Sequence, residues 1–129
     1  MVLSTYLVED NRTIRDNLVP ALEDLVGARV IGHAETEAEA VEWINLHPGD
    51  WHLLIVDLFL REGSGLGVLR FSRERSSRGS DQRMVVLSNY VNSDVRTRCM
   101  ALGADAVFDK SRELDAFFDY CNEFARTQA

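Results

Sequence analysis

Residues 53–60 read LLIVDLFL, the most apolar stretch of the chain, and a single carboxylate, Asp57, interrupts it. A short apolar run that is rich in branched side chains is typical of a strand buried on both faces of a parallel sheet. A membrane-spanning helix needs about 20 apolar residues, so this stretch is too short to cross a bilayer. We therefore predict a buried strand over 53–56 that ends at an aspartate.

Similar apolar runs lie on both sides of this strand and alternate with stretches of helical period. The other predicted strands are 4–8, 30–34, 84–87 and 106–108. The intervals leave one helix between successive strands, which is the pattern of repeated βα units. Right-handed crossovers with helices on both faces predict an α/β fold with a doubly wound, five-stranded parallel sheet. The flavodoxin-like strand order 2-1-3-4-5 is one common form of such a sheet.

Apolar stripes and capping residues predict five helices. The first, over 12–26, has one apolar stripe made of Ile14, Leu18, Leu22 and Leu25. The second begins with a capping box, because Glu39 follows Thr36 by three residues. The remaining three are predicted over 65–75, 94–102 and 114–125.

Length and composition are those of one globular domain, which we predict over residues 1–129. Apolar residues make up 46% of the chain and charged residues 27%, both close to globular averages. With 14 basic and 21 acidic side chains the net charge is −7, which disfavours direct binding of nucleic acid. We expect no membrane-spanning segment. The start of the chain lacks the basic region of a signal peptide, which favours a cytoplasmic protein.

Polar side chains follow four of the predicted strands at their carboxyl ends. They are Glu9 and Asp10 after the first strand, Asp57 after the third, Ser88 after the fourth and Lys110 after the fifth. The carboxyl ends of parallel strands form one rim, and ligands bind where the strand order reverses. In the order 2-1-3-4-5 that point lies between the first and third strands, so we expect these side chains to converge there.

Three carboxylates at one rim repel one another unless protons or a hard cation compensate them. Mg²⁺ prefers oxygen ligands and commonly bridges one or two carboxylates to a phosphate. Lys110 would add a positive charge and Ser88 a hydroxyl donor for phosphoryl oxygens. Each residue alone would be interpreted as a solvated strand end, but together they predict phosphoryl chemistry with Asp57 as the covalent nucleophile.

Four segments, in this order and spacing, resemble the receiver domain of two-component response regulators. They are VEDN (8–11), IVDL (55–58) with Gly65 downstream, VLSN (86–89), and LGAD (102–105) followed by FDK (108–110). The resemblance covers essentially the whole chain. It implies that Asp57 accepts a phosphoryl group from a histidine kinase or a phosphotransfer protein.

The resemblance also implies roles for the residues around Asp57. Mg²⁺ would be held by Asp10, Asp57 and the backbone carbonyl of Phe59, with Glu9 contributing through water. The phosphoryl oxygens would be held by Ser88, the backbone amide of Asn89 and Lys110. Such a domain promotes its own phosphorylation and dephosphorylation and is not otherwise an enzyme. It would signal through the face formed by the fourth helix, fifth strand and fifth helix, where a partner or a second copy docks.

Several positions depart from the family pattern. Val107 stands where the family places a switch aromatic, and Phe108 points to the opposite face of its strand. We therefore expect phosphorylation to move the helix over 94–102 and its loop, with a weaker rearrangement of the fifth strand. Arg61 and Ser111 replace frequent prolines, and Asn89 replaces a small residue. Val107 and Asn89 keep open a second interpretation, a receiver-like interaction module that is not phosphorylated.

Two further interpretations fail on spacing. The glycine-rich stretch 63–67 has Val68 where a dinucleotide-binding loop needs its third glycine, so we interpret it as a turn that starts a helix. A phosphatase with a DxD motif would need an acid where Phe59 stands.

Overall fold

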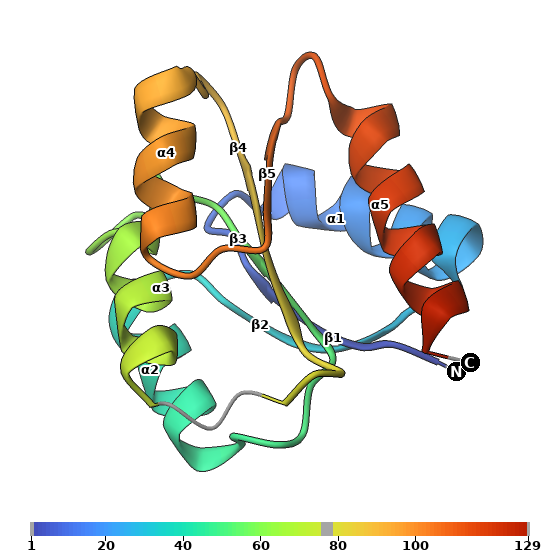
Figure 1. Ribbon diagram of the computed structural model, residues 1–129, viewed down its shortest axis with the longest axis horizontal. Coiled ribbons are helices and arrows are strands. Elements are labelled where there is room, and N and C mark those ends of the chain that lie inside the picture. Colours follow the sequence, from blue (N-terminus) through green and yellow to red (C-terminus); the bar gives the residue numbers. More distant parts are fainter. Residues whose placement is uncertain (1, 76–78, 129) are drawn as a thin grey trace.

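The computed structural model describes residues 2–75 and 79–128, in which five strands alternate with helices (Figure 1). The strands are β1 (Ser4–Val8), β2 (Arg29–Ala34), β3 (Leu53–Val56), β4 (Arg83–Ser88) and β5 (Ala106–Asp109). They form one sheet in the order β2-β1-β3-β4-β5, and every pair is parallel. The predicted α/β class and strand order are confirmed.

Helices cover both faces of this sheet (Figure 1). On one face lie α1 (Arg12–Ala21), its π-helical continuation η1 (Leu22–Val26) and α5 (Leu114–Thr127). On the other face lie α2 (Glu37–Leu46), α3 (Gly65–Glu74) and α4 (Ser93–Ala101). No helix among the described residues is long and apolar enough to span a membrane.

Alternation along the strands divides the core into two clusters, one on each face. Val8, Val56 and Val86 belong to the cluster under α2, α3 and α4, whereas Leu7, Ile55 and Leu87 belong to the cluster under α1 and α5. On β5, Val107 is buried in the first cluster and Phe108 packs on the second, with its ring 5.9 Å from that of Phe117. The predicted opposite orientation of residues 107 and 108 is confirmed.

The first helix differs from its prediction near Pro20. The α-helix ends at Ala21, and residues 22–26 wind as a π-helix instead of continuing the α-helix. Proline has no N–H to donate and its ring crowds the preceding turn, and a π turn is a local change of winding within such a helix. The wider period leaves Leu25 58% exposed, so its predicted place on the buried stripe is wrong.

Side-chain caps fix where the helices after β1 and β2 begin. The amide of Ile14 donates to Asn11 Oδ1 at 3.0 Å, and the amide of Glu39 donates to Thr36 Oγ1 at 3.2 Å. The Glu39 carboxylate accepts in return from the amide of Glu35 at 2.9 Å, one residue earlier than in a standard capping box. These caps hold the loops after β1 and β2 at the carboxyl rim of the sheet.

Candidate functional site

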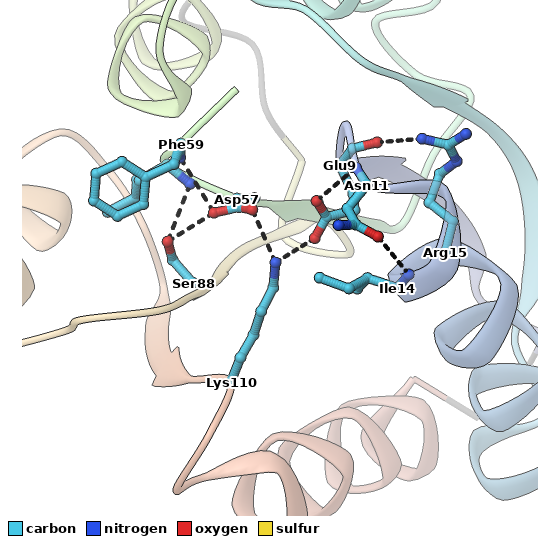
Figure 2. Close-up of polar contacts among 9 residues, drawn as sticks. Glu9, Asn11, Ile14, Arg15, Asp57, Phe59, Ser88 and Lys110 are labelled. Carbon is cyan, nitrogen blue, oxygen red and sulfur yellow. Dashed lines mark hydrogen bonds and ion pairs between the residues drawn. The ribbon is translucent and has the colours of Figure 1, made fainter. Parts of the chain in front are cut away.

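The carboxyl ends of β3, β4 and β5 bring Asp57, Ser88 and Lys110 into one hydrogen-bonded group (Figure 2). Asp57 follows β3 and is only 7% exposed. Ser88 Oγ donates to its Oδ1 at 2.7 Å, and Lys110 Nζ donates to its Oδ2 at 2.8 Å. Both carboxylate oxygens of Asp57 therefore face groups that donate hydrogen bonds.

Glu9 shares the ammonium of Lys110 with Asp57. Its buried carboxylate accepts from Lys110 Nζ through one oxygen and from the amide of Asn11 through the other, at 3.1 Å. Burial raises the pKa of Glu9, and the hydrogen bond from Lys110 opposes that shift. Burial alone would lower the pKa of Lys110, but its hydrogen bonds to Asp57 and Glu9 outweigh burial and raise it. Lys110 is therefore a charged ammonium held between two carboxylates.

Asp10 adds a third carboxylate to the rim. Carboxylate oxygens of Glu9, Asp10 and Asp57 all lie within 4.8 Å of one another. One ammonium cannot balance three carboxylates, and two of them, Glu9 and Asp57, are buried, so the site favours a further cation. Oxygen donors at this separation suit Mg²⁺, which keeps part of its water shell and needs only a few protein ligands. The residues present therefore fit a magnesium ion.

The remaining predicted residues lie at the edge of this group. The amide of Phe59 donates to Asp57 Oδ1 at 3.2 Å, while the residue is 60% exposed and its ring is turned away from that carboxylate (Figure 2). Asn89 is exposed and, with Lys110, lines a cavity of about 300 Å³ between α1 and α5. The site thus stays open on the side of Asn89.

Two residues whose roles the sequence did not predict hold the loops of this rim. Arg15 of α1 donates from Nη1 to the backbone carbonyl of Glu9 at 2.8 Å. Asp109 accepts from the Ser111 amide at 2.8 Å, from the Ser111 hydroxyl at 2.6 Å and from the Val91 amide at 3.2 Å. These hydrogen bonds lower the pKa of Asp109 to about 2. In the sequence, Arg15 is only an arginine one turn inside a predicted helix, and Asp109 is only an acidic residue beside Lys110. Neither position indicates these contacts by itself.

The glycine-rich stretch serves packing against β3. A Cβ atom on Gly65 would lie 2.2 Å from the backbone carbonyl oxygen of Asp57, closer than any side-chain atom can approach. α3 begins at this glycine, as expected for a turn that starts a helix. The stretch therefore brings α3 directly against the strand that carries Asp57.

Comparison with known proteins decides the family. Residues 5–121 match the response regulator receiver domain. The chain belongs to this family. The Response regulator UvrY of Escherichia coli (strain K12) is 24% identical over 109 residues, which are 84% of this chain and 48% of that protein. The receiver domain described here thus spans about half the length of the curated relatives that it matches.

Solved structures agree with this receiver fold. The receiver domain of Francisella response regulator 1452 superposes with a TM-score of 0.82 at 15% identity, covering 98% of this chain and 99% of that one. A LuxR-family DNA-binding response regulator from Staphylococcus aureus gives a TM-score of 0.81 at 15% identity, covering 96% and 99%. At such identities the likeness establishes the fold alone.

Proposed function

We propose that this receiver domain accepts a phosphoryl group on Asp57 from a phosphorylated histidine of a kinase or phosphotransfer protein in the cytoplasm. The proposal rests chiefly on one observation: the buried carboxylate of Asp57 lies between the hydroxyl of Ser88 and the ammonium of Lys110. The neighbouring carboxylates of Glu9 and Asp10 support Mg²⁺ as cofactor. The domain would promote its own phosphorylation and dephosphorylation without acting on a separate substrate.

The chemistry is an in-line displacement on phosphorus. A carboxylate oxygen of Asp57 forms a bond to phosphorus while the bond from phosphorus to the imidazole nitrogen breaks, and the electron pair leaves with the imidazole. Lys110 neutralises charge on the transferring oxygens, and the Ser88 hydroxyl and Asn89 amide donate hydrogen bonds to them. Mg²⁺, held by Asp10, Asp57 and the Phe59 carbonyl with Glu9 acting through water, would supply further charge neutralisation.

Output would begin at Ser88. A phosphoryl group adds roughly −1.5 to −2 charge and new acceptor oxygens, and Ser88 can turn its hydroxyl from Asp57 to one of them. The loop after β4 and the start of α4 would follow it. Because Val107 is too small to act as a rotating aromatic, the loop and α4 are the moving element within the α4, β5 and α5 face. A partner or a second copy would dock on that face.

The test is phosphorylation by acetyl phosphate with Mg²⁺, followed by intact mass measurement. We expect the wild type to gain one hydroxylamine-labile phosphoryl group and Asp57→Asn to gain none. Asp50→Asn, in an exposed turn, is the control and should behave like the wild type. A labile phosphoryl group on Asp57→Asn would place the acceptor elsewhere. A wild type that gains none would favour the unphosphorylated interaction module.

A further inference from the structure

We propose that Arg15 and Glu35 are positioning residues that hold the two ligand-bearing loops of the metal site at a fixed separation. The inference rests on the proposed function, because it concerns the residues that would bind Mg²⁺. One of these loops carries Glu9 and Asp10, and the other follows Asp57. Residues 35–37, which follow β2 and include the first residue of α2, connect to both.

Arg15 forms the link to the first loop. Its side chain is only 11% exposed, and its two terminal nitrogens have different partners. Nη1 donates to the backbone carbonyl of Glu9 at 2.8 Å (Figure 2), and Nη2 pairs with Glu35 Oε2 at 3.0 Å. The planar guanidinium fixes both directions at once. Because the Glu9 carbonyl belongs to the peptide that begins Asp10, this contact orients the ligand pair.

Glu35 and Glu37 form the link to the second loop. The other oxygen of Glu35 pairs with Arg61 Nη1 at 3.3 Å. Two residues further on, Glu37 Oε1 accepts from the amide of Ser64 at 2.8 Å, and its own amide donates to the carbonyl of Glu62 at 3.1 Å. Residues 35–37 are therefore bound to the loop after β3 through both side chains and backbone.

Gly63 in that loop and Gly67 in the first turn of α3 leave room for this contact. A Cβ atom on Gly63 would lie 2.4 Å from Glu37 Cβ, and one on Gly67 would lie 2.3 Å from Glu37 Oε2. Gly63 also has a φ of +79°, which other residues rarely adopt. The glycine-rich stretch 63–67, which resembled part of a dinucleotide-binding loop, therefore leaves room for the side chain of Glu37.

This connection matters because the ligands themselves repel. Carboxylate oxygens of Glu9, Asp10 and Asp57 lie within 4.8 Å of one another, and their repulsion, which the single ammonium of Lys110 offsets only in part, opposes this approach of the two loops. Groups that orient metal ligands from behind typically contribute about 10- to 100-fold in metal affinity. Removing the guanidinium of Arg15 should therefore weaken Mg²⁺ binding without removing any ligand.

The experiment compares Mg²⁺ affinity by titration calorimetry in Arg15→Met and Arg12→Met. Arg12 lies on the same helix, but its side chain is 85% exposed and its pairing with Asp16 is at 3.7 Å. We expect Arg15→Met to raise the Kd for Mg²⁺ about 10-fold and Arg12→Met to leave it unchanged. Arg15→Lys keeps the positive charge but loses the two-directional donor geometry of the guanidinium, so it should give an intermediate Kd. It replaces Arg15→Met in the comparison if that variant folds poorly.

A second readout needs no metal. With a chelator present, amide exchange over residues 9–12 should accelerate in Arg15→Met and in Glu35→Gln, and the double variant should add little to either. If the wild type binds Mg²⁺ and Arg15→Met matches Arg12→Met in both readouts, the positioning role is wrong. If the wild type itself does not bind Mg²⁺, the proposed function fails instead.

Discussion

Asp109 shows how a single side chain joins two loops of the site. It accepts hydrogen bonds from Val91 in the loop after β4 and from Ser111 in the loop after β5. Ser111 stands where the family often has proline, and a proline has no backbone N–H to donate. A proline at this position would remove both hydrogen bonds from Ser111 and leave Asp109 only the one from Val91.

The charge of Asp109 should be visible in acid unfolding. Its pKa of about 2 in the folded protein lies below the ordinary value of 3.8, so its stabilising effect is complete above the unfolded pKa and disappears as pH falls through the folded pKa. We expect the free energy of unfolding to fall less steeply from about pH 4 to about pH 2 in Asp109→Asn than in the wild type. Urea unfolding at several pH values measures this. Equal slopes for the two proteins would contradict the assignment.

Gly65 should tolerate no side chain. Because an added Cβ would lie 2.2 Å from the Asp57 carbonyl oxygen, Gly65→Ala must displace either α3 or the end of β3. We expect a loss of about 1–3 kcal/mol in the free energy of unfolding, together with slower phosphorylation of Asp57. Gly49→Ala is the control, since nothing lies within 4 Å of its added Cβ. Equal stability of the two variants would show that α3 can shift freely.

At the scale of elements, Arg96 ties α4 to its neighbours. Its Nη1 donates to the backbone carbonyl of Val107 on β5, and its Nη2 donates to Glu113 at 2.9 Å. The hydrogen bond from Arg96 lowers the pKa of Glu113. The side chain of Arg96 thus connects α4 to the backbone of β5.

Loss of this connection should loosen α4. In Arg96→Met we expect faster amide exchange across α4 and β5, and a loss of about 1 kcal/mol in the free energy of unfolding because the bonds are partly exposed. Arg98→Met is the control on the same helix, since Arg98 forms no ion pair with any residue in the described ranges 2–75 and 79–128. Unchanged amide exchange in Arg96→Met would show that the hydrogen bonds of Arg96 do not stabilise the packing of α4 on β5.

The sequence predicted the strands and helices better than the contacts between the segments that connect them. Every strand was found within a residue or so of its bounds, because a short continuous apolar run indicates a strand that is buried on both faces. The winding after Pro20 was not predicted, since a proline inside a helix can end, kink or widen it depending on packing. The roles of Arg15 and Asp109 were missed because each binds a backbone group of another segment, the Glu9 carbonyl or the Val91 amide, which no local pattern encodes.

At the scale of the whole molecule, topology explains why the site could be predicted. Glu9, Asp57, Ser88 and Lys110 are far apart in sequence but end or follow strands of one parallel sheet. Parallel strands collect their carboxyl ends at one rim, so the convergence followed from the strand order alone. Which donor faces which oxygen depends on side-chain positions, and only the structure gives the two contacts from Ser88 and Lys110 to Asp57.

Binding at that rim should stabilise the entire fold. A cation that binds only the folded chain raises the free energy of unfolding by about 1.4 kcal/mol at ten times its Kd. We therefore expect Mg²⁺ to raise the melting temperature of the wild type in a concentration-dependent way. Asp10→Ala should abolish this response, because the substitution removes one of three carboxylates whose oxygens lie within 4.8 Å.

The matched control for that measurement is Asp119→Ala, which removes an exposed carboxylate from α5 and should retain the full response to Mg²⁺. NaCl at equal ionic strength separates specific binding from screening of the net charge of −7. If NaCl reproduces the shift, or if Asp10→Ala keeps it, the rim binds no specific cation. A shift present in the wild type and in Asp119→Ala, but absent in Asp10→Ala, would locate the ion at the carboxyl ends of β1 and β3.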